Sequence, residues 1–330
     1  MASRYCPDCG EAAGEGFRFC ENCGAALRSR RTPEGGPLGP VAPGCVSCGE
    51  TVSADGFCEQ CGRAQPTGRD RMEFDLGFVA GVSDRGRSRV RNEDSMAFAT
   101  LGPKNAPEHI VAVVCDGVGS TERADEASQA AVDAALAAFL DALGDGRDPY
   151  ESTVDAAAAA FAAVRGLARS DSPDLAPSST FVSAVVTAGE VTVGWIGDSR
   201  AYWLSGGTSR QLTTDDTLYA QLLAADVPEE EAAAEPNAHA LVRWVGADAQ
   251  ERLPNVLTLP ADTPGTLVLC SDGLWNYLPT AESIAAKTPD APPLAVAAEL
   301  TATALAAGGG DNITVVVVPH PFDQQGSADE

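Results

Sequence analysis

Four aspartates lie at the ends of apolar, strand-like runs, where charged side chains are uncommon. They are Asp116 after VAVVC, Asp198 after VTVGWIG, Asp272 after TLVLCS, and Asp311 before NITVVVV. Each has a glycine beside it, and any one of them taken alone fits a simple turn. Their shared position indicates instead that the ends of several buried strands bring carboxylates together.

Carboxylates gathered in this way predict a site for hard divalent cations. The candidate ligands are Asp116, Asp272 and Asp311, together with Glu93 and Asp94. Oxygen donors without imidazole or thiolate suit Mg²⁺ or Mn²⁺ better than Zn²⁺, and so many acids repel one another unless cations neutralise them. Two ions about 3.5 to 4 Å apart would do so, and would also activate a water and hold a phosphoryl group for in-line attack. Because glycine lets the backbone approach a metal, the Gly117 carbonyl is a further candidate ligand.

A phosphoryl substrate also needs a positively charged partner. Arg89, five residues before Asp94, is the natural bidentate ligand for phosphate. The motifs of other hydrolytic enzymes are missing from the sequence. The three His do not have the spacing of a His-rich metallohydrolase centre, and no Cys has an Arg six residues later, as the cysteine-phosphatase loop requires. Neither the G-x-S-x-G motif of a serine nucleophile nor the G-x-x-x-x-G-K-[ST] phosphate-binding loop occurs. Hydrolysis at carboxylate-bound metal is the chemistry that remains.

Eight of the ten cysteines lie within the first 61 residues as four C-x-x-C pairs, each followed by glycine. The pairs are Cys6 and Cys9, Cys20 and Cys23, Cys45 and Cys48, and Cys58 and Cys61. Their spacing predicts two four-cysteine zinc ribbons, each holding one structural Zn²⁺ that supplies folding energy. The alternative is a disulfide framework, which requires an oxidising compartment. Cys115 and Cys270 lie inside apolar runs and are expected to be packed core thiols.

The rest of the chain alternates strand-like runs with Ala-rich stretches. We expect helices at 122–143, 149–169, 279–288 and 292–307, in an α+β fold whose helices cover sheets. The expected domains are a ribbon at 1–27, a Pro/Gly-rich linker at 28–44, a ribbon at 45–62, a linker at 63–72, a large domain at 73–320 and a disordered tail at 321–330.

The charge is strongly negative and unevenly distributed. The formal net charge is −25, of which residues 1–71, with 8 Lys+Arg and 9 Asp+Glu, contribute −1. Such a field disfavours nucleic acid and anionic membranes and attracts cations. No run of 18 apolar residues and no signal-like N-terminus is visible, which indicates a cytoplasmic protein without a membrane contact.

Five segments, in a fixed order, carry a family resemblance. They are SDRGRSRVRNEDS (83–95), VCDGVGS (114–120), GDSRAYWL (197–204), SDGLW (271–275) and GGGDNITVVVV (308–318). The chain thereby resembles the PPM family of metal-dependent serine/threonine protein phosphatases, the type 2C class, particularly its bacterial members. The resemblance implies an αββα sandwich, two antiparallel sheets flanked by helices, with a binuclear Mn²⁺ or Mg²⁺ centre that hydrolyses phosphoserine and phosphothreonine without a phosphoenzyme.

The resemblance also implies roles for the individual residues. Asp116 would bridge both metals, Asp272 and Asp311 would complete one site, and Asp94 or Glu93 with the Gly117 carbonyl would complete the other. Asp198 resembles the acid of a third, weaker metal site, and Arg89 resembles the arginine that binds the substrate phosphate. Asn312 would support the metal ligands without binding a metal itself.

Two departures from the family pattern concern substrate choice. The segment after Gly119 reads STERADE, and LTTDDT places Asp216 where a histidine is common. Residues 213–240, with the acidic run PEEEAAAE, are expected to form a mobile flap whose charge disfavours acidic phosphopeptides.

The expected partners are phosphorylated proteins, including a Ser/Thr kinase or its targets, and a protein partner for the zinc ribbons. Two other functions fit the sequence less well. A catalytically weak phosphoprotein-binding or scaffold protein would have no need of so costly a set of acids. A nucleic-acid regulator acting through its ribbons disagrees with the acidic charge.

Overall fold

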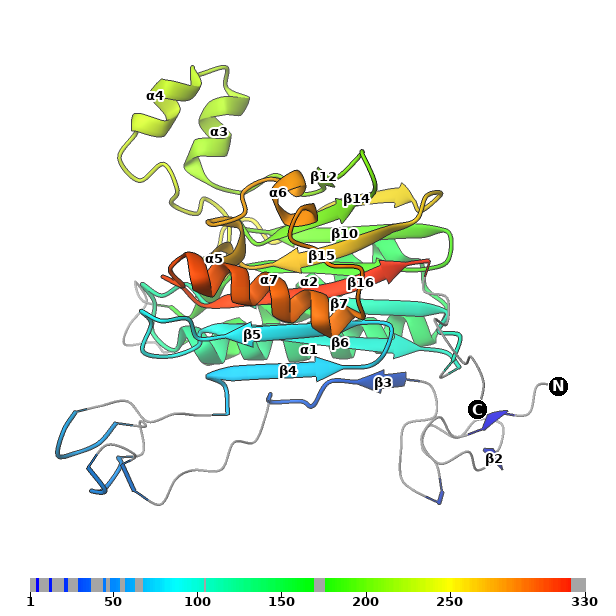
Figure 1. Ribbon diagram of the computed structural model, residues 1–330, viewed down its shortest axis with the longest axis horizontal. Coiled ribbons are helices and arrows are strands. Elements are labelled where there is room, and N and C mark those ends of the chain that lie inside the picture. Colours follow the sequence, from blue (N-terminus) through cyan, green and yellow to red (C-terminus); the bar gives the residue numbers. More distant parts are fainter. Residues whose placement is uncertain are drawn as a thin grey trace.

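The computed structural model describes residues 4–5, 12–13, 21–22, 29–36, 44–45, 48–53, 57–62, 68–103, 105–168 and 176–321. The expected tail from residue 322 onward and the first four cysteines lie outside these ranges. The described part is built around two six-stranded antiparallel sheets that pack face to face (Figure 1).

The strand order fixes which segments become neighbours. In the first sheet the order is β14 (Asn255–Pro260), β10 (Glu190–Ile196), β9 (Phe181–Val186), β7 (His109–Asp116), β6 (Asp94–Leu101) and β3 (Ser29–Arg31). In the second it is β12 (Arg210–Gln211), β11 (Arg200–Leu204), β15 (Gly265–Cys270), β16 (Ile313–His320), β5 (Ala80–Asp84) and β4 (Arg71–Asp75). Two small pairs join β13 (Val245–Gly246) to β8 (Ser178–Ser179) and β1 (Arg4–Tyr5) to β2 (Ala12–Ala13).

Helices cover the outer face of each sheet. The long helices α1 (Ala124–Gly144) and α2 (Pro149–Leu167) pack on the first sheet, and α5 (Asp272–Trp275), α6 (Ala281–Ala285) and α7 (Pro293–Ala307) pack on the second (Figure 1). All four expected helices are confirmed within a few residues at their ends. Helix α2 begins where the Asp148 side chain accepts hydrogen bonds from the backbone N–H groups of Tyr150 and Glu151. The αββα sandwich expected from the resemblance is therefore confirmed.

Strand β7 shows why the apolar runs are continuous. Its residues Val111, Val113 and Cys115 face the helices, whereas Ile110, Ala112 and Val114 face the other sheet. Since both faces of the strand are buried, alternation between apolar and polar residues disappears. Only the strand end, where the sandwich opens, can hold a polar side chain such as Asp116. Cys115 and Cys270 are both fully buried, as expected for core thiols.

The structure differs from the expected linker at 28–44. Residues 29–31 form β3, the edge strand that pairs with β6 through Ser29 and Leu101, Arg30 and Thr100, and Arg31 and Ala99. The contact continues beyond the strand, because the Thr32 N–H donates to the Phe98 carbonyl at 3.0 Å. The segment between the two ribbons is thus in part a strand of the large domain.

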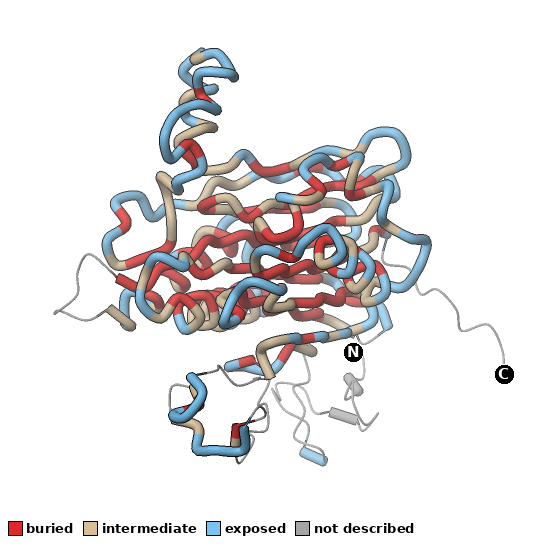
Figure 2. Tube along the Cα trace, turned by 60° about the vertical axis from the view of Figure 1, so that its left-hand side comes forward, coloured by how far each residue is buried: buried red, intermediate tan, exposed pale blue. Residues whose placement is uncertain are grey.

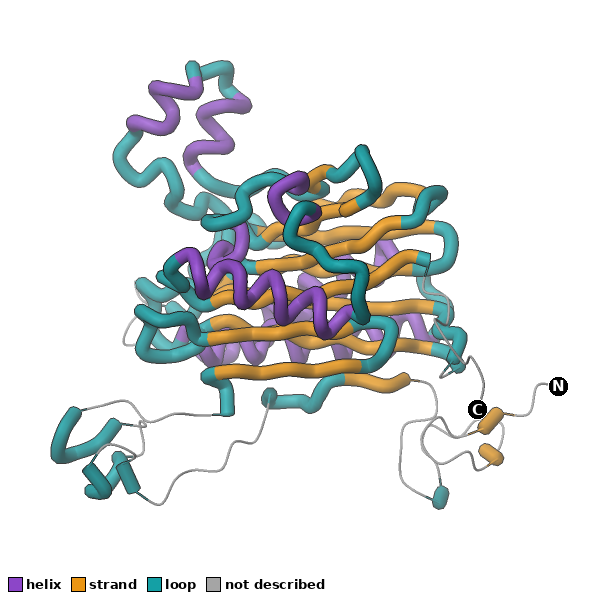
Figure 3. The backbone as a smooth tube through the Cα atoms, in the orientation of Figure 1, coloured by secondary structure: helices purple, strands orange, loops and turns teal. Residues whose placement is uncertain are grey.

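Two segments project from the sandwich. Helices α3 (Leu218–Ala224) and α4 (Glu229–Ala234) rise from one end, and their residues are mostly exposed (Figures 1 and 2). The cysteine-bearing segment 44–62 projects separately, and its described parts are loops (Figure 3). Among the described helices, none has the length and apolar character that crossing a membrane requires.

Candidate metal centre

Two acids of the centre meet at the ends of neighbouring strands. Strand β6 begins at Asp94 and β7 ends at Asp116, and the antiparallel register pairs these two residues directly. The next residue, Gly117, has no room for a side chain, because a Cβ there would lie 2.5 Å from the Ala124 carbonyl oxygen. Glycine therefore lets the chain turn away tightly after Asp116 and into the start of α1.

The second sheet supplies two more acids. Asp272 is the first residue of α5, separated from β15 by Ser271 alone, and Asp311 lies two residues before the start of β16. These two strands are neighbours, and Gly273 allows their ends to meet, because a Cβ at this position would lie 1.9 Å from the Asn312 carbonyl oxygen. The acids of the two sheets consequently face one another across the same end of the sandwich.

A cavity at this end brings the predicted site residues together. Among its lining residues are Arg89, Glu93, Asp116, Gly117, Asp198, Asp272, Asp311 and Asn312. Asp94 is the exception among the expected ligands: it does not line the cavity, and its side chain is fully buried. The predicted site residues other than Asp94 thus line one cavity.

Burial makes these carboxylates costly to ionise without a counter-charge. Burial, with smaller contributions from neighbouring acids, raises the pKa of Asp94 to about 6, of Asp198 to about 7 and of Asp272 to about 8. The same causes raise the pKa of Asp116 well above its usual range. Half-burial is likewise the main cause that raises the pKa of Glu93.

The donor set fits divalent cations. The Oδ1 atoms of Asp94 and Asp272 are buried and form no hydrogen bond with the part of the chain that the structure describes. A buried carboxylate oxygen without a partner is costly, whereas cations between the acids would satisfy it and offset their repulsion. The residues present therefore suit Mg²⁺ or Mn²⁺.

Hydroxyl groups from the second sheet fix Asp94. Ser271 and Thr314 donate to its Oδ2 atom at 2.6 and 2.7 Å, and Arg69 donates to its backbone carbonyl at 3.1 Å. Sequence reasoning did not assign roles to these three residues. Their contacts span up to 220 residues of sequence, so no local pattern reveals them.

A chain of contacts fixes Asp198. The Trp275 indole donates to the Asp198 carbonyl oxygen at 2.9 Å, and the Arg200 guanidinium lies 3.8 Å from the centroid of the Trp275 ring. Asp215 in turn accepts two hydrogen bonds from Arg200, at 2.7 and 2.9 Å. Arg200 and Trp275 stand in the motifs GDSR and SDGLW, but sequence reasoning missed their contact.

Arg89 and Asn312 form hydrogen bonds between the loop that joins β5 to β6 and the loop before β16. Arg89 donates to an Asp311 carboxylate oxygen at 2.6 Å, and this hydrogen bond is the main cause that raises the arginine pKa. Asn312 accepts from the Glu93 N–H at 2.8 Å and donates to the carbonyl oxygens of Arg85 and Arg91. These contacts hold Arg89 beside the acids.

Asp216, the residue where the family commonly has histidine, lies outside the lining of the cavity. Its carboxylate accepts from the Gly197 N–H at 3.0 Å and pairs with Arg243 at 3.2 Å. It therefore supports the loop that carries Asp198. The flap was expected at 213–240, but Thr217 and Leu241 form a bridge at its base, so the projecting flap comprises residues 218–240. Leu241 lines the cavity.

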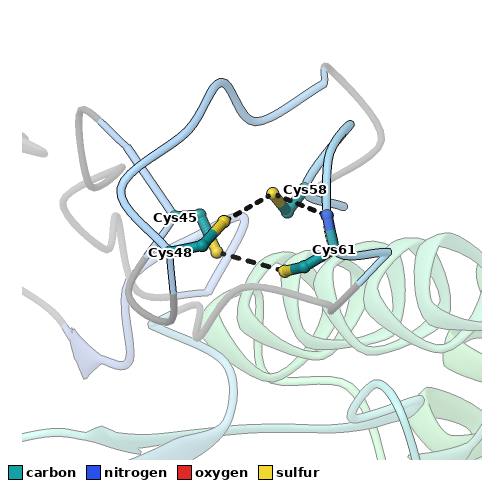
Figure 4. Close-up of side chains that lie close together, drawn as sticks. All are labelled: Cys45, Cys48, Cys58 and Cys61. Carbon is teal, nitrogen blue, oxygen red and sulfur yellow. Dashed lines mark hydrogen bonds between the residues drawn. The ribbon is translucent and has the colours of Figure 1, made fainter.

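The second set of four cysteines forms a separate candidate site (Figure 4). The Sγ atoms of Cys45, Cys48, Cys58 and Cys61 all lie within 4.8 Å of one another. Two of the Sγ–Sγ distances are 3.6 Å, between Cys45 and Cys61, and 3.4 Å, between Cys48 and Cys58. These separations exceed the ~2.05 Å of a disulfide and approach the ~3.8 Å between thiolates around tetrahedral zinc, so they favour the metal over the disulfide alternative.

Comparisons with known proteins agree with this geometry. A family model described as protein phosphatase 2C matches residues 85–304, and one described as double zinc ribbon matches residues 6–62. The serine/threonine phosphatase stp of Listeria innocua is 30% identical over 251 residues, which cover 74% of this chain and 96% of that protein. The serine/threonine protein phosphatase PstP of Mycobacterium tuberculosis is 32% identical over 75% of this chain and 45% of its own length.

Solved structures show the same fold. A PPM Ser-Thr phosphatase from Mycobacterium smegmatis in complex with cacodylate matches with a TM-score of 0.59 and 27% identity, over 73% of this chain and 97% of that one. The catalytic domain of PstP in complex with two manganese ions matches with a TM-score of 0.57 and 28% identity, over 73% of this chain and 96% of that one.

Proposed function

This chain belongs to the protein phosphatase 2C family of metal-dependent protein phosphatases, and we propose that it hydrolyses phosphoserine and phosphothreonine in proteins at a binuclear Mn²⁺ or Mg²⁺ centre. The observation that carries the proposal is the convergence of five acids on one cavity at an end of the sandwich. There, the buried Oδ1 atoms of Asp272 and of Asp94 have no hydrogen-bond partner among the described residues. Acids so placed suit a metal-dependent hydrolase, since a packing role would favour uncharged residues.

Each residue has a role in this proposal. Asp116 would contribute to both metal sites, Asp272 and Asp311 would complete one of them, and Asp94 or Glu93 with the Gly117 carbonyl would complete the other. Asp198 would hold a third, weaker ion. When bound, the ions supply a water of lowered pKa and neutralise the charge on the phosphoryl oxygens.

Arg89 binds the phosphate of the substrate. Its guanidinium is 44% exposed and already lies at the cavity, within 2.6 Å of Asp311. A planar guanidinium can donate two parallel hydrogen bonds to a phosphate, which orients the phosphorus for attack by water. Asn312, which bonds the Glu93 N–H, keeps the ligand-bearing loops in register.

The proposed function includes a role for the zinc ribbons and a role for the enzyme in the cell. The ribbons each hold one Zn²⁺ and bind a protein partner or regulate the enzyme, and the phosphatase opposes a Ser/Thr kinase in the cytoplasm. A double zinc ribbon model matches residues 6–62, and the near-neutral charge of residues 1–71 suits a protein partner better than nucleic acid.

The test is phosphate release by the purified full-length protein across a Mn²⁺ titration. Phosphothreonine and phosphoserine peptides should be hydrolysed only when Mn²⁺ or Mg²⁺ is added, and a phosphotyrosine peptide should be a poor substrate. No turnover at any metal concentration would contradict the proposal and favour a role in phosphoprotein binding.

A further inference from the structure

A short basic loop borders the metal centre of this otherwise acidic chain. Residues 85–91 read RGRSRVR and hold four of the 22 basic residues in a chain with 47 acidic ones. The loop follows β5 directly and leads, through Asn92 and Glu93, into β6. Its charge therefore lies at the mouth of the candidate site.

Backbone contacts hold this loop against the loop that carries Asp311. The Arg87 N–H donates to the Gly309 carbonyl at 2.7 Å. Asn312 donates to the carbonyl oxygens of Arg85 and Arg91 at 2.8 and 2.9 Å. Since both ends and the middle of the basic loop are bonded, its side chains project from a defined backbone beside the metal ligands.

The four arginines have different surroundings. Arg85 lies 3.5 Å from Asp70, and Arg89 is bonded to Asp311 in the cavity. Arg87 is exposed and forms no ion pair with the described residues. Arg91 is also exposed, and its guanidinium lies 5.3 Å from the ring centroid of Phe57. Arg87 and Arg91 thus present positive charge on the rim of the site.

The opposite rim is acidic. The flap at 218–240 contains five acids, all exposed, and no Lys or Arg. These acids are Asp226, Glu229, Glu230, Glu231 and Glu235. The flap begins at the bridge between Thr217 and Leu241, beside the cavity. In Figure 1 the flap, formed by α3 and α4, rises above the end of the sandwich at which β5 leads into the basic loop.

We propose that Arg87 and Arg91 bind an anionic group, a carboxylate or a second phosphate, on one side of the phosphorylated residue of the substrate, while the flap faces basic residues on the other side. This inference rests on the proposed phosphatase activity. Charges on exposed rims act over about one Debye length, ~8 Å in physiological salt, so each rim acts on its own side of the phosphate more than on the other. The enzyme then selects the order of charges along the substrate as well as its net charge.

The test uses two phosphothreonine peptides of identical composition. One carries Asp residues before the phosphothreonine and Lys residues after it, and the other carries the reverse order. With the zinc-loaded, Mn²⁺-loaded full-length enzyme, one order should have a kcat/KM roughly threefold to tenfold higher than the other, as expected for a few exposed ion pairs. The double variant Arg87→Glu/Arg91→Glu should abolish or reverse this preference.

Three controls sharpen the result. A neutral phosphothreonine peptide should be hydrolysed at a similar rate by the wild type and the double variant, which establishes that the metal centre is intact. The second control is Arg210→Glu, which removes an exposed arginine far from the rim. Arg210 lies on β12 and pairs with Trp203, toward the end of β11 that is farther from Asp198. This variant should keep the wild-type preference. Replacing Asp in the favoured peptide by phosphoserine shows whether the rim prefers a phosphate or a carboxylate.

Two outcomes would overturn the inference while leaving the phosphatase activity established: equal kcat/KM for the two orders in the wild type, or a preference that persists in the double variant. Failure of the wild type to hydrolyse any of the phosphothreonine peptides would instead refute the proposed function, and this inference with it.

Discussion

The Arg89 guanidinium donates a hydrogen bond of 2.6 Å to the Asp311 carboxylate, across 222 residues of sequence. The proposed phosphate-binding cation therefore lies in direct contact with a proposed metal ligand. We expect a divalent cation bound at Asp311 to weaken this contact and leave the guanidinium to a substrate phosphate.

This contact gives a prediction for Arg89→Lys. Lysine keeps the charge but cannot form two parallel hydrogen bonds, so phosphate binding should weaken. We expect KM for a phosphothreonine peptide to rise roughly tenfold, which is the effect of one charge-assisted hydrogen bond. Steady-state kinetics at saturating Mn²⁺ would measure it, and an unchanged KM would remove Arg89 from the phosphate site.

Ser271→Ala tests how Asp94 is held. The substitution removes a hydroxyl that donates to Asp94 at 2.6 Å and accepts from the Thr314 N–H at 3.0 Å, both in the buried interior. The free energy of unfolding should fall by roughly 1 to 3 kcal/mol. Urea denaturation measures the change. In the control Ser205→Ala, which loses an exposed hydrogen bond to the Pro264 carbonyl, the change should be smaller. Equal losses in the two variants would argue against a special role for the Asp94 contact.

Trp275→Phe tests the support of Asp198. The change removes the indole N–H that bonds the Asp198 carbonyl but keeps an aromatic ring beside Arg200. Since residues that hold metal ligands commonly alter metal affinity, the Mn²⁺ concentration for half-maximal activity should rise roughly tenfold. Trp244→Phe, which loses an indole hydrogen bond to Asp248, should leave it unchanged. The same Mn²⁺ requirement in all three proteins would mean that the Trp275 contact is not needed.

Truncation tests where the large domain begins. Removing residues 1–27 should leave its stability intact, whereas removing 1–71 takes away β3 and the bonds from Arg69 to Asp94, Ser95 and Gln129. The longer truncation should lower the free energy of unfolding by about 2 kcal/mol or more. Urea denaturation of both truncated proteins measures this difference. The variant Arg69→Met in the full chain measures the contribution of the Arg69 side chain separately from that of β3. Two truncated proteins of equal stability would show that β3 and Arg69 contribute nothing.

Local sequence patterns indicated the α+β class and most of the acids that line the cavity. The run before Asp116 is apolar at every position because β7 is buried on both faces. A single acid at the end of such a run fits a turn, but acids at the ends of several such runs indicate a shared ligand site. Each ligand motif lies at one end of such a strand. The family resemblance then supplied the sandwich of two antiparallel sheets flanked by helices.

The supporting contacts could not be predicted in this way. The bonds from Ser271 to Asp94 and from Trp275 to Asp198 depend on how the two sheets pack, which no short segment encodes. Strand β3 was missed for another reason. Its three residues, SRR, are polar and show no apolar alternation, and the strand is held mainly through its backbone at an exposed sheet edge.

The most direct test of the metal centre compares the wild type with Asp116→Asn, which keeps the size of the side chain and removes its charge. Mn²⁺ binding by calorimetry and phosphothreonine peptide hydrolysis would be measured on the same zinc-loaded samples. The wild type should bind two Mn²⁺ ions and turn over substrate, whereas the folded variant should bind fewer ions and show no metal-dependent turnover. Wild-type turnover in Asp116→Asn would contradict the central claim that this carboxylate bridges the catalytic ions.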